Sequence, residues 1–159
     1  MNPRGAWRIV WGMTHGFSDE LTARLAAYHD RLEEAERRGP SSLAQVFDHP
    51  PPGIGAHEID AEMRVLRVND GDLRLLGYAR EEFVGRPVLE FIVMTETAQR
   101  AIGRKLTGEL ALKPFMRTFK RKDGSAIALV LLDRFLRDAP GQVIGLRTVL
   151  AEADRSSAS

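Results

Sequence analysis

The sequence has 159 residues, of which 43% are hydrophobic and 28% are charged. These values are typical of one globular domain with a single core, and they exclude a fibrous or largely disordered chain. The 23 basic and 22 acidic residues leave a net charge of +1, so no field of one sign predicts nucleic acid or an anionic membrane as a partner. The chain has no cysteine, which excludes disulfides, thiolate metal sites and cysteine nucleophiles.

Three zones are expected along the chain: an N-terminal extension over residues 1–40, a main domain over 41–152 and a small, polar, disordered tail over 153–159. No apolar run reaches the roughly 20 residues that a membrane span needs. The start of the chain lacks the continuous apolar core of a signal peptide, so a cytoplasmic location is expected. Trp7 and Trp11 are four residues apart and can share one helical face.

A helix is predicted over residues 18–38. Ser18 can cap its start, two acidic residues follow that cap, and Gly39 with Pro40 ends it. Apolar residues spaced by four and three form one seam along the helix: Leu21, Leu25, Tyr28, Leu32 and Ala35. The seam covers only about two heptads. It therefore packs either on the sheet of its own domain or on the same helix of a partner subunit, and the sequence does not separate these alternatives.

The main domain is predicted to alternate strands and helices in a fixed order. The expected elements are a short helix from Ser42 to near Asp48, strands over 53–60 and 63–69 joined by a two-residue turn, short helices over 70–76 and 81–85, a longer helix over 95–106 capped by Thr95, and strands over 115–121, 126–136 and 142–150. Asp123-Gly124 favours a tight hairpin. The run 127–132 is apolar on both faces, which indicates a strand covered on both sides.

Short motifs in this order resemble those of PAS domains. They are Asn69 at the end of the second strand, Leu75-Leu76-Gly77-Tyr78, the run EEFVGRP over 81–87, the run FKRKDGS over 119–125, and Gly145-Leu146-Arg147. The resemblance spans residues 43–152. It implies an α+β fold with a five-stranded antiparallel sheet and helices over one face. It also implies that the helix at 18–38 is a flanking helix of the kind that many such domains use to form homodimers.

The same resemblance raises the question of a cofactor. Relatives of this family hold haem, flavin, a small metabolite or no ligand. Flavin adducts and covalent cinnamoyl chromophores need a cysteine, which this chain lacks. The haem ligand of oxygen-sensing relatives is a histidine on the longer helix, and residues 95–106 contain none. The cofactor therefore stays unknown, with haem disfavoured.

His57 remains the candidate interior histidine. On an alternating strand it shares a face with Ile59. Three interpretations stay open for it: a hydrogen-bonded histidine in or beside the core, a ligand contact, and a haem ligand. Asn69 has two, a cap for the helix that begins at Asp70 or a residue bordering the pocket. Arg117 shares a face with Phe115, so it points either into the pocket or toward its solvent rim.

The candidate pocket residues are His57, Asn69, Phe91, Met94, Phe115 and Arg117, with apolar lining expected from Ile59, Val68, Ile102 and Leu131. No metal-ligand spacing, nucleophile elbow or acid–base pair is recognisable, which disfavours an enzyme. The first hypothesis is a sensory domain that binds a small, mostly apolar ligand and signals through a homodimer or a partner protein. The alternative is a ligand-free interaction module. A haem or flavin sensor is a third reading.

Overall fold

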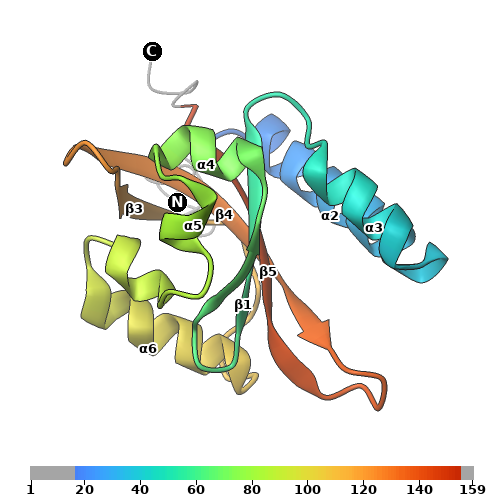
Figure 1. Ribbon diagram of the computed structural model, residues 1–159. Helices are drawn as coiled ribbons and strands as arrows, with labels where there is room; N and C mark the ends of the chain where they lie inside the picture. Colours follow the sequence, from blue (N-terminus) through green and yellow to red (C-terminus); the bar gives the residue numbers. More distant parts are fainter. Residues whose placement is uncertain (1–16, 155–159) are drawn as a thin grey trace, which may run out of the picture.

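A computed structural model describes residues 17–154, and its centre is a five-stranded antiparallel sheet (Figure 1). The strands stand in the order β2-β1-β5-β4-β3. Their bounds are β1 (Ile54–Asp60), β2 (Val65–Val68), β3 (Phe115–Lys120), β4 (Ala126–Arg137) and β5 (Val143–Glu152). This is the predicted sheet, with strands where alternation and turn residues placed them.

Helices cover both faces of the sheet, as Figure 1 shows. Their bounds are α2 (Asp19–Arg38), α3 (Pro40–Asp48), α4 (Asp70–Leu76), α5 (Arg80–Phe83), the 3-10 helix η1 (Val88–Phe91) and α6 (Thr95–Leu106). The face covered by α4, α5, η1 and α6 is called the inner face here. The face covered by α2 and α3 is called the outer face.

Strand β4 contributes to both cores, as its unbroken apolar run predicts. Ile127, Leu129 and Leu131 point into the inner core. Val130 and Leu132 point into the outer core. Successive residues of a strand alternate between faces, so any displacement of this strand is felt on both sides of the sheet.

The apolar seam of α2 packs on the sheet of its own domain. Its five residues are each 5% exposed or less, and four of them pack in the outer core against residues such as Phe47, Val130 and Val149. The seam is thus hidden within one chain. Of the two alternatives for the seam, this structure has the one in which it packs on the sheet of its own domain.

Both ends of α2 are closed as the sequence predicts. The Ser18 hydroxyl accepts a hydrogen bond from the Leu21 amide, and the same hydroxyl donates to the carboxylate of Asp154.

Ala153 packs against the outer core. Residues 153 and 154 therefore contact the folded domain, while the rest of the expected tail, 155–159, lies outside the described residues. Trp7 and Trp11 also lie outside them.

Two local predictions were wrong. The connection between β1 and β2 is longer than two residues, because β2 begins only at Val65 and Met63 adopts a positive φ of 67°. Thr95 is the first residue of α6 and not its cap: the capping position is Met94, and the Thr95 hydroxyl donates to the Ile92 carbonyl instead.

Candidate functional site

Three polar side chains form a row across the inner face, called the polar row here. His57 on β1 pairs with Thr148 on β5, and Thr148 pairs with Asp133 on β4. All three are at most 4% exposed. Because opposite residues on neighbouring strands lie side by side, the register brings together residues that are far apart in the sequence.

Asp133 is the hub of this row. One carboxylate oxygen accepts a hydrogen bond from the Thr148 hydroxyl at 2.6 Å, and the other accepts one from the Lys105 ammonium of α6 at 2.8 Å. The Lys105 nitrogen also lies 3.4 Å from the centroid of the Phe115 ring. Burial lowers the pKa of Lys105, and the negative charge of Asp133 opposes that shift. The negative charge of Asp133 offsets the cost of burying the Lys105 ammonium group.

His57 is a hydrogen-bonded core histidine, as the first of its three interpretations states. Its Nδ1 lies 2.6 Å from a carboxylate oxygen of Asp72 on α4, and its ring meets the Phe83 ring edge-on at 6.0 Å. The cavity beside it measures about 10 Å³, which is room for about one water molecule. Neither a haem nor a flavin fits this cavity as it stands.

Arg117 joins the interior to the surface. It lines the small cavity together with the polar row, and it also lines a surface groove of about 310 Å³ between α6 and β3. Burial lowers the pKa of Arg117, and only the negative charge of Asp133 opposes this. Its guanidinium carbon lies 4.7 Å from the centroid of the Phe115 ring. Arg117 is therefore a half-buried cation that belongs to both spaces.

The remaining predicted pocket residues separate in the structure. Phe91 packs in the inner core, 4.4 Å from Phe83 between ring centroids. Met94 is 66% exposed and sits on the groove, not in the interior. Phe115 lies between the groove and Lys105. The predicted pocket is therefore two separate spaces, a small interior cavity and an open surface groove, and Arg117 lines both.

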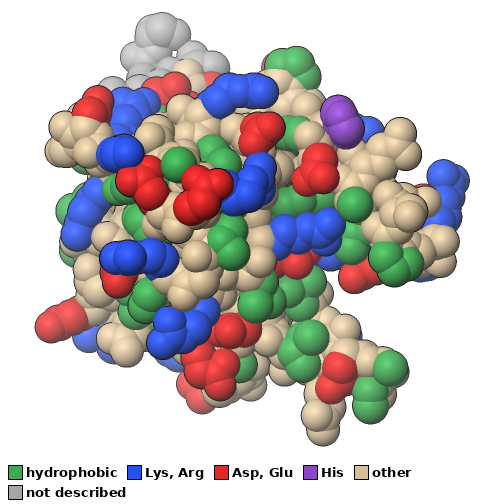
Figure 2. Space-filling model, in the orientation of Figure 1, with side chains coloured by type: hydrophobic (Ala, Val, Ile, Leu, Met, Phe, Trp, Pro, Cys, Tyr) green, Lys and Arg blue, Asp and Glu red, His purple; other side chains and the backbone are tan. Residues whose placement is uncertain are grey.

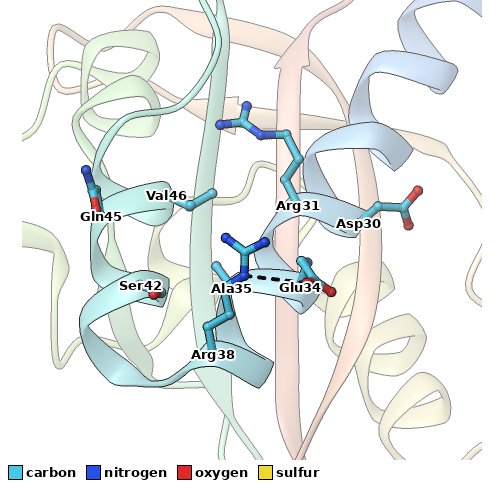
Figure 3. A pocket seen from close by; sticks show the side chains of 8 residues that line it. All are labelled: Asp30, Arg31, Glu34, Ala35, Arg38, Ser42, Gln45 and Val46. Carbon is cyan, nitrogen blue, oxygen red and sulfur yellow. Dashed lines mark ion pairs between the residues drawn. The ribbon is translucent and has the colours of Figure 1, made fainter.

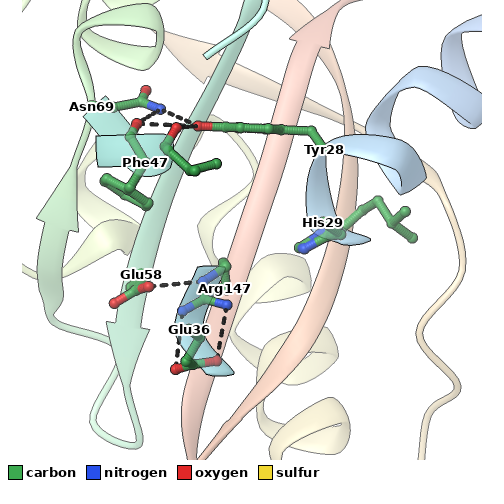
Figure 4. Close-up of polar contacts among 9 residues, drawn as sticks. Tyr28, His29, Glu36, Phe47, Glu58, Asn69 and Arg147 are labelled. Carbon is green, nitrogen blue, oxygen red and sulfur yellow. Dashed lines mark hydrogen bonds and ion pairs between the residues drawn. The ribbon is translucent and has the colours of Figure 1, made fainter. Parts of the chain in front are cut away.

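Asn69 belongs to neither space. Its side-chain oxygen accepts hydrogen bonds from the Asp72 amide at 3.1 Å and the Ala56 amide at 2.9 Å. Its side-chain nitrogen donates to the Phe47 carbonyl at 2.8 Å (Figure 4). It caps α4 and ties that helix to β1 and α3. The interpretation of Asn69 as a cap is confirmed.

Sequence reasoning missed three residues of this site: Lys105, Asp133 and Thr148. One signal was present in the sequence, because Asp133 directly follows the apolar run 127–132. Lys105 also continues the buried side of α6, three residues after Ile102. An ionisable residue at a core position of two different elements indicates a buried pair, although the partners cannot be named before the elements are packed.

The outer face also carries polar groups, and they hold α2 (Figure 4). The Arg147 guanidinium donates to Glu58 at 2.8 Å and reaches Glu36 on α2 at 3.4 Å. The His29 ring lies with Nε2 2.7 Å from the Leu132 carbonyl, and burial lowers the pKa of His29 to about 4. Burial raises the pKa of Tyr28 to about 12. These groups fix the position of the helix on the sheet.

A surface hollow lies elsewhere, between α2 and α3 (Figure 3). It measures about 460 Å³, and Asp30, Arg31, Glu34 and Arg38 stand around it with both signs of charge. Arg38 and Glu34 form an ion pair at 3.5 Å with both side chains exposed. Basic and acidic side chains are similarly mixed on the face drawn in Figure 2. Such a surface carries no directed charge.

Within residues 17–154, no group of three or more histidine, aspartate or glutamate side chains is arranged to hold a metal ion. No helix of this part of the chain is long and apolar enough to cross a bilayer.

Comparison with known proteins shows what fold this is. No family model matches the sequence, and no curated protein matches it. Solved structures do match. A PAS domain from Colwellia psychrerythraea has a TM-score of 0.62 at 18% identity, covering 70% of this chain and 94% of that one.

Two further structures agree with that result. The PAS domain of an HTR-like protein from Haloarcula marismortui has a TM-score of 0.57 at 23% identity, covering 78% of this chain and 96% of that one. A domain of a sensory box sensor histidine kinase/response regulator from Geobacter sulfurreducens has a TM-score of 0.57 at 18% identity, covering 70% and 92%. The chain therefore has a PAS-like fold, as its motifs predict.

Proposed function

We propose that this chain is a sensory, signal-transduction domain that binds a small, mostly apolar ligand at the inner face of its sheet. The ligand enters the groove between α6 and β3 and reaches toward the interior behind Arg117. The observation that carries the proposal is the polar row with Lys105 and Arg117. Charged groups are expensive to bury, and packing alone would be served as well by apolar residues of similar size.

The fold neighbours support a sensory role. The Geobacter structure is described as a domain of a sensory box sensor histidine kinase/response regulator. A fold alone does not determine function, so the argument rests on the site. Its location matters, because Asp133 and Thr148 lie on the two strands whose opposite sides hold α2 through Leu132 and Arg147.

A signal can cross the sheet by this route. A ligand that moves Lys105 or Arg117 changes the contacts of Asp133, and β4 transmits that change to the outer face. The ligand then shifts the position or the stability of α2 by the difference in its affinity for the two arrangements. The output passes through a partner protein or a second copy of the chain. The outward sides of α2 and α3, around the hollow described above, are the surface proposed for that contact.

An absorption spectrum and native mass spectrometry of the freshly purified protein test the proposal. We expect a protein without a visible chromophore, and a small colourless molecule that denaturation releases. Titration of a small-molecule library, followed by amide chemical shifts, extends the test to weak ligands. The proposal fails if no molecule is released and none perturbs α6 and β3.

One observation favours a second candidate, a ligand-free interaction module. The interior cavity of about 10 Å³ is too small for any organic ligand, so the inner core is filled as the structure stands. In this alternative the polar row only fixes the packing of α6, and all function lies in surface contacts. The mass spectrometry and titration above separate the two candidates.

A further inference from the structure

The strongest unexplained feature of the molecule is the charge balance around Asp133. Two cations lie near this single carboxylate: Lys105 donates a hydrogen bond to it, and Arg117 lines the same small cavity. Both of its oxygens already accept hydrogen bonds, from Lys105 and from Thr148. Within residues 17–154 the Arg117 guanidinium has no carboxylate within 4.0 Å and no hydrogen-bond acceptor. Its neighbour is the Phe115 ring, at 4.7 Å from the centroid, so its charge has no anionic partner among these residues.

Removing a guanidinium from water is costly unless an anion or hydrogen-bond acceptor compensates. Partial burial accordingly lowers the pKa of Arg117. An arginine offers a planar fork of donors that fits the two oxygens of a carboxylate. An anion that reached Arg117 would restore neutrality and satisfy those donors together.

The groove in front of Arg117 is lined largely by apolar side chains. Its walls include Met94, Ala98 and Ala101 on one side and Phe115 and Met116 on the other. Met94 and Met116 are among the large apolar side chains that the described surface exposes, at 66% and 37%. The volume of about 310 Å³ is about twice that of a cavity known to hold benzene. Flexible methionines also adapt to ligands of varied shape.

Charge decides between kinds of anion. The site lacks one negative charge, which a carboxylate supplies. A phosphate dianion would bring one charge too many into an apolar groove, and Lys105 is already occupied by Asp133. Taken together, these features point to a monoanion with a hydrocarbon part.

We propose that the groove between α6 and β3 binds an amphiphilic carboxylic acid, with its carboxylate on Arg117 and its hydrocarbon part along Met94, Ala101 and Met116. This inference rests on the proposed function and names the class of its ligand. The carboxylate stands at the mouth of the interior, beside the Lys105–Asp133 pair. Binding there changes the field acting on the pair that connects α6 to β4.

Octanoate is the probe for a direct test, with 1-octanol and octylamine as neutral and cationic controls of the same chain length. Calorimetric titration and thermal unfolding of the full chain measure binding. We expect octanoate to bind and raise the Tm, 1-octanol to bind at least 10-fold more weakly, and octylamine not to bind. Equal binding of octanoate and 1-octanol would overturn the role of the charge.

Substitutions locate the charge that matters. Arg117→Gln should weaken octanoate binding at least 10-fold and leave the Tm of the free protein unchanged or higher, because it removes an unpaired cation. Arg117→Lys should bind octanoate with intermediate affinity. The matched control is Arg104→Gln, which removes an exposed cation from α6, the helix on the other side of the groove, and should leave octanoate binding unchanged. Retention of octanoate binding by Arg117→Gln would refute the assignment.

A second variant keeps the test decisive if Arg117→Gln fails to fold. Met94→Glu places a negative charge on an exposed rim position of the groove and removes an apolar contact, so it should weaken the binding of octanoate more than the binding of 1-octanol. Inorganic phosphate is the last probe: if it binds as tightly as octanoate, the groove takes anions without an apolar part and the inference fails.

If 1-octanol binds as well as octanoate, this inference fails while the proposed function stands. If no probe or library molecule binds and the purified protein releases none, both fail.

Discussion

The two faces of the sheet use polar residues in opposite ways. On the outer face the charges are paired: Arg147 forms a buried ion pair with Glu58 and also reaches Glu36, whose side chain is 52% exposed. On the inner face, Lys105 and Asp133 are 4% and 3% exposed, and Arg117 has no anionic partner within residues 17–154. The outer arrangement attaches a helix. The inner arrangement leaves a charge unsatisfied, and that difference is why we place the ligand there.

The largest expected effect comes from breaking the inner pair. Asp133→Ala leaves the Lys105 ammonium buried without an acceptor, so we expect the free energy of unfolding to fall by about 3–5 kcal/mol. The double variant Lys105→Met, Asp133→Leu should be close to wild type, because both charges are removed together. Urea unfolding measures both. An Asp133→Ala protein as stable as wild type would mean that the inner pair is not buried.

The next largest effect concerns the outer seam. Leu25 is fully buried, and Leu25→Ala should lower the free energy of unfolding by about 3 kcal/mol because it leaves a cavity between α2 and the sheet. The oligomeric state measured by analytical ultracentrifugation should not change. If Leu25→Ala dissociated a dimer and left the free energy of unfolding of the monomer unchanged, the seam would pack on a partner subunit instead of on its own sheet.

Acid should loosen the outer face. The pKa of His29 is lowered to about 4 in the folded chain from 6.5, so below pH 6.5 the unfolded chain takes up a proton that the folded chain does not. Stability is therefore full above pH 6.5 and falls as the pH drops toward 4, by roughly 2 kcal/mol at pH 5. His29→Gln should remove this part of the pH dependence. Urea unfolding at pH 7 and pH 5 checks it, and an equal pH dependence in both proteins would contradict it.

The smallest effect sharpens the contrast between the faces. Arg134 pairs with Asp30 and Glu33 of α2 at 2.8 and 2.9 Å, but these side chains are 30%, 69% and 39% exposed. We expect Arg134→Ala to lower the free energy of unfolding by about 0.5–1 kcal/mol, and by less in high salt. A loss as large as that of Asp133→Ala would erase the distinction between the two faces.

Local patterns predicted much of this fold. The seam of α2, the Asp-Gly hairpin and the doubly apolar run of β4 depend on spacing within one element, which the sequence displays. Asn69 was foreseen as a cap for the same reason. The inward direction of His57 also followed from alternation on its strand.

What sequence did not predict depends on contacts between elements. A heptad seam is equally compatible with a sheet or a partner helix, so only packing decided for α2. The polar row exists because the strand register aligns His57, Thr148 and Asp133, and a register between distant strands has no local signature. Met94 was expected in the pocket, but it occupies the capping position of α6, where its side chain is 66% exposed.

Amide hydrogen exchange of α2, with and without saturating octanoate, tests the central claim most directly. The claim is that ligand at Arg117 on the inner face alters a helix held on the outer face. We predict that octanoate changes the protection of α2 amides in the wild-type chain and not in Arg117→Gln. If octanoate saturates the wild-type protein and changes protection only in α6 and β3, binding is not transmitted across the sheet and the sensory account is contradicted.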